Sequence, residues 1–199
     1  MTTPWLGYAP GRAWDEAMDI EGQPRAPYMA VYREIEQMSA EDLRQRAEAL
    51  ASNYLAQGVT FDHAGEERPF PLDIVPRVVS SADWDIIEPG VAQRVRVVEA
   101  FLDDVYGRQR CVTEGVVPRR LITSSQHFHR AAAGIRPPGG VRVHVSGIDI
   151  VRDQHGIHRV LEDNGRVPSG VSYVLSNRRA MSQMYSELFA TMGIRPVLE

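Results

Sequence analysis

Two carboxylates and an amide in the last third of the chain are spaced so that they could bind a metal ion. Asp149 is followed thirteen residues later by Glu162, and Asn164 lies two residues further on. Carboxylate and amide oxygens are the ligands that Mg²⁺ prefers, whereas zinc favours His and Cys. These three residues are therefore candidate magnesium ligands. The alternative is a polar strand end whose acids face water, and the spacing alone leaves both interpretations open.

The sequence around these residues predicts the hairpin that would bring them together. Valines alternate with polar residues over 141–145, a period of two that is typical of a strand. Asp153-Gln154-His155-Gly156 is a turn signal with glycine in its last place. Residues 157–161 are rich in aliphatic side chains and predict the return strand, which continues into Glu162. We therefore expect strand, tight turn and strand.

The register of this hairpin decides which side chains share a face. If Arg152 faces Ile157, pairing places Asp149 opposite Val160 and Gly147 opposite Glu162. Residues two apart lie on the same side of a strand. Asp149, Glu162 and Asn164 would then project to one side and Asp163 to the other.

Composition excludes several classes of protein. The net charge is −4, so no basic surface argues for nucleic acid binding. No apolar run approaches the roughly 20 residues of a membrane span, and the N-terminus has no signal-peptide pattern. Cys111 is the single cysteine, which excludes an intrachain disulfide framework and suits a reducing compartment. We expect a cytoplasmic protein that binds neither nucleic acid nor membrane.

All 22 basic residues are arginine, and the sequence contains no lysine. Codon bias in a GC-rich genome would explain this, but the chemical consequence is the same. The chain has no lysine for a Schiff base, a nucleophile or a nucleotide phosphate. A phosphate site made from this chain would have to use arginine or backbone amides.

The remaining sequence alternates between helical stripes and extended pieces. Apolar residues at three- and four-residue steps predict amphipathic helices, the second with Ser39 as its N-cap. Arg94 and Arg96, two apart on one of these helices, are expected to be solvated. The expected helices are 27–35, 39–58, 81–84, 89–106 and 172–192. Short strands are expected at 59–61 and 121–123, an edge strand or extended segment at 70–79, and a polar turn at 62–68.

These elements predict an α+β fold, with a helical N-terminal half packed on a mixed or antiparallel sheet, and a hairpin followed by a helix. We expect an extended arm over 1–25, a mixed region over 26–135 and the hairpin region over 136–199. The arm's aromatic residues could anchor it in the core or on a partner; they are Trp5, Tyr8 and Trp14.

A second metal pattern is His127-Phe128-His129. An H-x-H on a strand can put two imidazoles on one face, as zinc sites do. No cysteine, third histidine or nearby acid completes the set in the sequence. Oxygen ligands in the hairpin are the better-supported metal site.

The motifs together resemble the circularly permuted ATP-grasp family, and within it the glutathionylspermidine synthetase-like peptide ligases. The resemblance covers the chain from about residue 14 onward and is most specific over 136–178. The residues that carry it are Asp149, Glu162-x-Asn164, Pro168-Ser169-Gly170, Tyr28 to Tyr32, Pro71 to Arg77, Arg136 to Gly139, His144 to Asp149 and Leu161 to Tyr173.

The resemblance implies an ATP-grasp-like metal-binding hairpin and a reaction class. Such enzymes phosphorylate a carboxylate with ATP, and an amine then attacks the acyl phosphate to form an amide and ADP. ATP and Mg²⁺ are the implied cofactors, with small-molecule or peptide carboxylates and an amine acceptor as partners. The implied roles are metal binding by Asp149, Glu162 and Asn164, acyl-phosphate binding by Arg166 or Arg152, and phosphate binding by the amides of Ser169 and Gly170.

Two departures from the family pattern matter. Many relatives carry an arginine where this chain has Gly147, two positions before the first metal acid. The lysines that grip the nucleotide come after the metal motif in the permuted order, and this chain has none. We therefore expect an N-terminal portion of a longer protein, inactive alone, with Leu198-Glu199 as a cloning remnant. The further partners are then the C-terminal part of the same protein and, in a homo-oligomer, other copies.

Two other functions stay open from the sequence. A non-catalytic binding or assembly module could retain the hairpin as a scaffold. A metal-dependent hydrolase could use the same acids.

Overall fold

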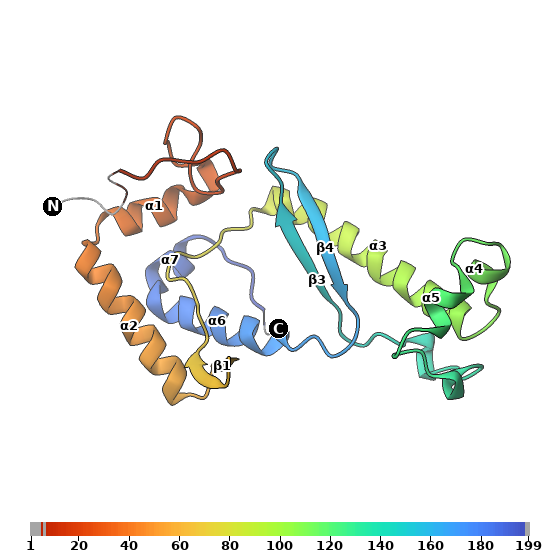
Figure 1. The fold of residues 1–199 in the computed structure, drawn as a ribbon. Coiled ribbons are helices and arrows are strands. Elements are labelled where there is room, and N and C mark those ends of the chain that lie inside the picture. Colours follow the sequence, from red (N-terminus) through yellow and green to blue (C-terminus); the bar gives the residue numbers. More distant parts are fainter. Residues whose placement is uncertain (1–4, 6, 198–199) are drawn as a thin grey trace. The chain divides into compact units, whose positions relative to one another are not determined.

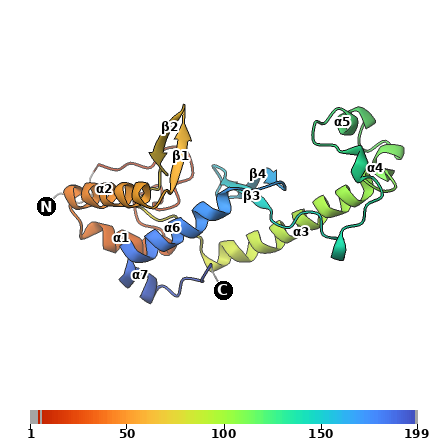
Figure 2. The ribbon, with the colours of Figure 1, turned by 90° about the horizontal axis from the view of Figure 1, so that it is seen from below.

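The computed structural model describes Trp5 and residues 7–197, which form two compact units (Figures 1 and 2). The first comprises Met1–Ser80, Arg152–Arg159 and Ser169–Glu199, and the second Ser81–Val151 and Val160–Pro168. The described chain holds seven α-helices and two separate two-stranded sheets. The predicted α+β class is confirmed. The three-region division of the chain stays a prediction, and Leu198–Glu199 lie outside the described residues.

Four helices build the first unit. They are α1 (Met29–Glu36), α2 (Ala40–Ala56), α6 (Gly170–Met184) and α7 (Ser186–Thr191), and the 3₁₀ turn η1 (Ala26–Tyr28) precedes α1. Figure 1 shows α2 and α6 beside one another, although more than 110 residues separate them in sequence. The predicted helix over 172–192 is divided in two at Tyr185, which lies between α6 and α7. None of the described helices is long and apolar enough to cross a membrane.

The core of this unit lies between α1 and the α6–α7 pair. Its buried side chains are Tyr28, Val31, Ile35, Met38, Met181, Tyr185 and Leu188. Burial raises the pKa of the Tyr28 and Tyr185 hydroxyls, and both have hydrogen-bond partners. The Tyr185 hydroxyl donates to the Ile74 carbonyl (2.7 Å), and the Val78 amide donates to the Tyr28 hydroxyl (2.9 Å). The proline-broken segment 70–79 is therefore tied to the core without forming a strand.

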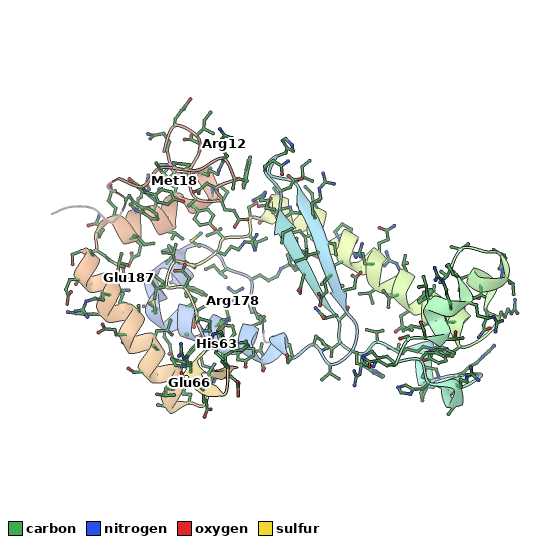
Figure 3. The ribbon with its side chains drawn as sticks, viewed as in Figure 1. Arg12, Met18, His63, Glu66, Arg178 and Glu187 are labelled. Carbon is green, nitrogen blue, oxygen red and sulfur yellow. The ribbon has the colours of Figure 1, made fainter. Side chains whose placement is uncertain are left out.

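Local sequence signals explain how α2 begins and how the N-terminal arm is anchored. Ser39 and Asp42 form a reciprocal capping box at the start of α2, as the predicted N-cap requires. Trp5 packs against the core and stacks on Tyr32 with ring centroids 5.5 Å apart, which supports anchoring in the same chain. The arm also buries Met18, labelled with Arg12 in Figure 3.

The predicted polar turn over 62–68 is a β-hairpin. Strand β1 (Thr60–His63) pairs antiparallel with β2 (Glu66–Pro69), and His63 lies opposite Glu66, both labelled in Figure 3. The two strands are joined by Ala64 and Gly65 alone, so the sequence showed polar residues on both sides of a short turn and no apolar alternation. The prediction of a loop here is wrong.

The second unit is organised along α3 (Ser81–Val105) and includes α4 (Arg110–Thr113), α5 (Arg119–Thr123), η2 (Arg130–Ala132) and η3 (Pro138–Gly140). The predicted pair of helices is one helix, which continues through Pro89. The predicted strand over 121–123 is wrong, because these residues form α5 directly after Pro118. Three residues are too few to distinguish a strand from a helical turn by periodicity.

The hairpin that carries the candidate ligands consists of β3 (Gly147–Arg152) and β4 (His158–Asn164), and α6 follows it. The predicted strand, turn, strand and helix order is confirmed. The predicted start of the first strand at Val141 is wrong, since 141–146 are not in a strand. The Glu99 carboxylate instead binds the backbone amides of Arg142 (2.8 Å) and Val143 (2.6 Å), which satisfies these donors without a partner strand.

Candidate functional site

The turn of the hairpin is fixed by one aspartate. The Gly156 amide donates to the Asp153 carbonyl (2.9 Å), as in a β-turn, and the Asp153 amide donates to the Ile157 carbonyl (3.0 Å). The Asp153 carboxylate accepts from the His155 and Ile157 amides (2.9 Å each) and from Arg159 Nε (2.9 Å). Asp153 thus closes the turn and determines how the two strands meet.

Acid is expected to loosen this turn. The Ile157 amide, together with the Arg159 guanidinium and the His155 amide, holds the pKa of Asp153 below its usual value. A carboxylate whose pKa is lowered on folding contributes stability above its unfolded pKa of about 3.9. That contribution is lost as the pH falls through the lowered folded value. The backbone amide resonances of His155 and Ile157, followed by NMR against pH, should report this transition.

Asp153→Asn is the variant that checks this prediction. Asn cannot titrate, so the variant should lack the transition at these two amides, whereas the exposed Asp85→Asn in α3 should retain it. An acid transition of equal midpoint in Asp153→Asn would contradict the assignment.

At the other end of the hairpin, Asp149 and Asn164 lie together. Asn164 Nδ2 is 3.4 Å from Asp149 Oδ1. A Cβ placed on Gly147 would lie 3.6 Å from the Asn164 Cβ and 3.1 Å from the Pro168 Cβ. Gly147 therefore has Asn164 as its near neighbour, and not Glu162 as the predicted register had it. Because Gly147 has no side chain, β4 and the loop that follows it can lie close to β3 at this point.

The separation of these two groups fits a small cation. An octahedral Mg²⁺ with bonds of about 2.1 Å holds neighbouring ligand oxygens roughly 3 Å apart. The Asp149 Oδ1 to Asn164 Nδ2 distance of 3.4 Å is near that value. The amide orientation follows from the hydrogen bond alone, and a half-turn of the side chain puts Asn164 Oδ1 in place of the nitrogen. Asp149 and Asn164 could thus supply two ligands to one ion.

Glu162 is placed on β4 with its side chain exposed. This side chain makes no hydrogen bond or ion pair with any residue that the structure describes. Among residues 5 and 7–197, no group of three His, Cys, Asp or Glu side chains is placed to hold a metal ion. Of the three candidate ligands on the hairpin, the structure therefore brings two together, Asp149 and Asn164.

Asp163 points away from Asn164 and forms an ion pair with Arg94 of α3. Arg94 Nε donates to Asp163 Oδ1 (2.8 Å), and a second contact joins Arg94 Nη2 to Asp163 Oδ2. The hydrogen bonds from Arg94 hold the pKa of Asp163 below its usual value. This agrees with the prediction that Asp163 faces the opposite side from the ligands. Arg94, which was expected to be solvated, is 42% exposed and forms this ion pair in addition.

A signal for the Arg94 contact was present in the sequence. Arg94 lies three residues after Val91 and four before Val98, so it belongs to the apolar stripe of α3. An arginine on that stripe faces whatever packs there. The sequence could not show that the packing element would be β4.

Arg166, expected to bind an acyl phosphate, lies beside His127. Arg166 Nη1 is 3.4 Å from His127 Nδ1, and Arg166 forms no ion pair with a described carboxylate. Val167, the next residue, has φ of +49°, an uncommon and strained conformation for a β-branched side chain, although 82% of its surface is exposed. His127 of the H-x-H pattern thus contacts an arginine, while the His129 amide donates to the Tyr106 hydroxyl (3.3 Å).

The other predicted phosphate-binding residues lie in the first unit. Arg152 Nε donates to the Gly156 carbonyl (3.0 Å), so this side chain is folded onto the hairpin turn. Ser169 is the residue before α6, and Gly170 is the first residue of that helix. The Ser169 side chain makes no capping bond, and its carbonyl accepts from Ser172 Oγ (3.0 Å).

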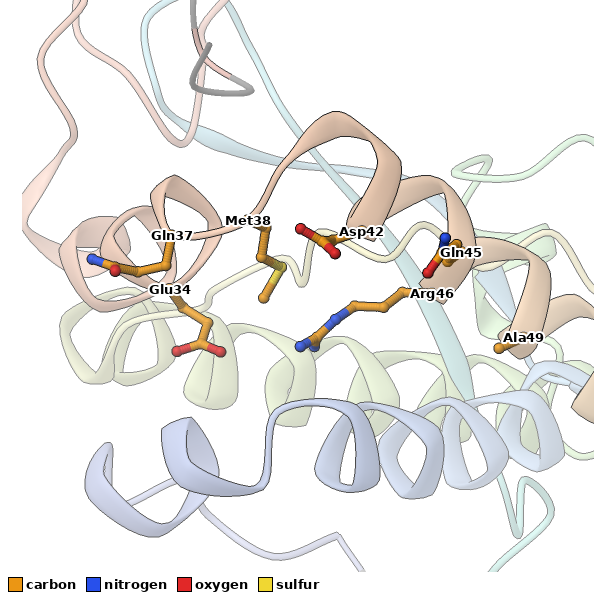
Figure 4. Close-up of a pocket in the computed structure, with 7 residues that line it drawn as sticks. All are labelled: Glu34, Gln37, Met38, Asp42, Gln45, Arg46 and Ala49. Carbon is orange, nitrogen blue, oxygen red and sulfur yellow. The ribbon is translucent and has the colours of Figure 1, made fainter. Parts of the chain in front are cut away.

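Two surface hollows lie elsewhere in the first unit. One is formed by α1 and α2, with Glu34, Asp42 and Arg46 among its lining residues (Figure 4). The other lies between α2 and α6 and is lined by residues such as Asn53, Tyr54 and Arg179. Neither lining includes a candidate ligand or a candidate phosphate-binding residue.

Comparison with known proteins gives relatives that match nearly the whole chain. An uncharacterized protein of Mycobacterium leprae is 54% identical over 185 residues, which is 93% of this chain and 33% of that protein. An uncharacterized protein of Synechocystis is 43% identical over 194 residues, covering 96% of this chain and 40% of that protein. A Frankia alni protein, provisionally named glutamate–cysteine ligase 2-3, is 40% identical over 185 residues, 91% of this chain and 21% of that protein.

The chain therefore spans between about a fifth and two fifths of the length of these relatives. A family model described as a circularly permuted ATP-grasp matches residues 76–199, more than half of the chain. That match includes α3, the whole β3–β4 hairpin and α6. This chain belongs to the circularly permuted ATP-grasp family.

Proposed function

We propose that this chain is the metal-binding part of an ATP-dependent carboxylate–amine ligase that acts through an acyl phosphate. The observation that carries the proposal is the Asp149–Asn164 pair, 3.4 Å apart on a hairpin inside the family match. The Frankia relatives, provisionally named glutamate–cysteine ligases, support a reaction that joins a carboxylate to an amine.

The proposed division of labour follows from the chemistry of each group. Mg²⁺ held by Asp149, Glu162 and Asn164 would neutralise phosphate oxygens of bound ATP. Arg166 would grip an anionic phosphate, since it has no described carboxylate partner and a planar guanidinium forms bidentate bonds to such groups. The amides of Ser169 and Gly170 at the N-terminus of α6, a helix of fifteen residues, would bind a second phosphate.

Arg152 is the weaker of the two arginine candidates. Its guanidinium is already engaged by the Gly156 carbonyl and lies 3.9 Å from Glu16, so a phosphate would compete with both. Arg166 has no such competitor among the described residues. We therefore assign the acyl phosphate to Arg166.

The ligase would require more chain than is present here. In the second unit, the buried apolar side chains among the described residues are Val105 and Ile122, whereas Val97 and Leu161 are 59% and 70% exposed. Apolar surface of this extent is expected to be covered in a stable protein. We propose that the further sequence corresponding to the longer relatives supplies the cover and the nucleotide-binding groups. In a homo-oligomer, other copies of the chain would also cover this apolar surface.

The 199-residue chain alone is expected to show no ATP hydrolysis, because its candidate residues supply only part of a phosphoryl-transfer site. Release of inorganic phosphate from Mg·ATP by the purified chain should equal the rate without protein. Hydrolysis that is present in the wild type and lost in Asp149→Ala would contradict the proposal that the site is incomplete.

The ligase function is tested on the polypeptide at the length of its relatives. Hydroxylamine serves as the amine, and amino acids and short peptides serve as carboxylates, because an acyl phosphate and hydroxylamine give a hydroxamate. The proposal expects hydroxamate and ADP in equal amounts, with a requirement for Mg²⁺. Binding of Mg·ATP without ADP formation from any carboxylate in the set would favour the non-catalytic module instead.

A further inference from the structure

The turn of the β3–β4 hairpin rests on the indole ring of Trp14, in the N-terminal arm. A Cβ on Gly156 would lie 2.8, 2.8 and 2.9 Å from three carbon atoms of that ring. Gly156 also has φ of +76°, which L side chains rarely adopt. The turn and the ring are therefore in contact at a distance that only glycine permits. Such a close fit indicates that the turn packs against Trp14 in one specific position.

Arg152, the last residue of β3, contacts the Trp14 ring as well. Its guanidinium carbon lies 5.5 Å from the Trp14 ring centroid, within the range of a cation–π interaction. Its Nη1 lies 3.9 Å from Glu16 Oε1, and both side chains are about four-fifths buried, at 19% and 20% exposed. Water screens a pair so enclosed less than one on the surface. The end of β3 is thus held by the Trp14 ring and by the Glu16 carboxylate, both in the arm.

The arm is itself fixed where it receives the turn. Arg77 binds Glu16 through two nitrogens, Nε to Oε2 (2.6 Å) and Nη2 to Oε1 (2.7 Å). Arg25 lies over the Trp14 ring at 4.0 Å, and its Nε donates to the carbonyls of Asp15 (2.8 Å) and Met18 (3.0 Å). Glu16 and Trp14 are therefore each held by a partner other than the turn, Glu16 by Arg77 and Trp14 by Arg25.

From this arrangement we infer that Trp14 and Glu16 are positioning residues for the candidate metal site. A turn determines the register of the strands it joins, and a change of register moves every side chain along the strand. Holding Arg152 and Gly156 against the arm would thus fix where Asp149 and Asn164 meet. The match to the family model begins at residue 76, so the arm lies outside the matched residues. The inference rests on the proposed metal function of the hairpin.

The inference is tested by Mn²⁺ binding to the complete 199-residue chain, measured by electron paramagnetic resonance. Trp14→Ala is expected to weaken Mn²⁺ binding by roughly 10-fold or more, as loss of outer groups that orient metal ligands does. Trp14→Phe, which keeps an aromatic face, should recover most of that loss. Trp84→Ala, in α3, is the matched control and should bind like the wild type. If Trp14→Ala does not fold, Glu16→Gln takes its place as the test variant. Glutamine has the size of glutamate, and this variant should weaken Mn²⁺ binding by less than is expected for Trp14→Ala.

Hydrogen exchange separates a failure of this inference from a failure of the metal proposal. The Gly156 and Ile157 amides should exchange faster in Trp14→Ala than in Trp84→Ala, with or without metal. Wild-type Mn²⁺ affinity in a folded Trp14→Ala chain would overturn the positioning role. If the wild type binds no Mn²⁺, the metal proposal fails. In that case, unchanged exchange of the Gly156 and Ile157 amides in Trp14→Ala would show that the arm does not hold the turn.

Discussion

On the proposed ligase function, replacing Asp149 by alanine is expected to lower kcat/KM for Mg·ATP by about 10²- to 10⁴-fold in the polypeptide at the length of its relatives. Several kcal/mol of transition-state stabilisation come from a metal ion that bridges phosphate oxygens, and each 1.36 kcal/mol is about tenfold in rate. The Asp149 carboxylate accepts from Asn164 Nδ2, so its removal takes the charged partner of this amide away from the cation. Steady-state assays of ADP formation measure the effect.

The control for this prediction is Asp85→Asn, which removes an exposed carboxylate from α3 without touching the hairpin. It should leave kcat/KM unchanged. Glu162→Ala should lose activity along with Asp149→Ala if both bind metal. A full-length Asp149→Ala protein with wild-type kcat/KM at limiting Mg²⁺ would contradict the assignment of Asp149 as a ligand.

Replacing Tyr185 by alanine is expected to reduce the free energy of unfolding of the first unit by about 3–5 kcal/mol, the usual loss for a large buried aromatic residue. Tyr185 is 2% exposed, and it lies at the junction of α6 and α7 against the core. Its hydroxyl also holds the Ile74 carbonyl. The loss combines a cavity, lost apolar burial and an unpaired carbonyl. Urea unfolding followed by circular dichroism measures it.

Two variants apportion this loss. Tyr185→Phe keeps the ring and removes only the hydrogen bond, so it should cost about 1 kcal/mol. Glu187→Ala changes an exposed residue of α7 and should cost little. A Tyr185→Ala chain as stable as Glu187→Ala would show that the α1 and α6–α7 contact does not hold this unit together.

Elements with strong local signals could be predicted from the sequence. The apolar stripe and the Ser39 cap predicted α2, and both are present. The Asp153–Gly156 signal predicted the hairpin turn, where a side chain and a glycine in a left-handed conformation act within five residues. Such signals are local, because the residues that cause the structure lie next to each other in the chain.

Elements that depend on distant groups could not be predicted in this way. The alternation over 141–145 is that of a strand, but the Glu99 carboxylate takes its backbone amides. Arg94 was expected in water and binds Asp163, 69 residues away. Both contacts join α3 to segments far away in the sequence, and the sequence could not show which segments these would be.

The candidate site also combines features that the sequence could predict with features that it could not. The period of two predicted that Asn164 and Asp149 would share a face and that Asp163 would not, and their contacts agree with this. Gly147 lies beside Asn164 and not beside Glu162, and at the turn Asp153 instead of Arg152 hydrogen-bonds to Ile157, so the predicted register is wrong. Asp149 and Asn164 nevertheless come within 3.4 Å of each other, as two residues on one face do. The contacts of Arg166 with His127 and of Arg152 with the arm join distant segments and carry no sequence signal.

Paramagnetic broadening by Mn²⁺ tests the central claim most directly, because it identifies the residues nearest the ion without any assay of activity. The isotope-labelled chain is titrated with substoichiometric Mn²⁺, and its side-chain and backbone NMR signals are followed. We expect the Asn164 side-chain amide and the Asp149 and Glu162 backbone amides to broaden first, with no such effect in Asp149→Ala. Broadening that begins at other carboxylates, or that is unchanged in Asp149→Ala, would contradict a metal site on this hairpin.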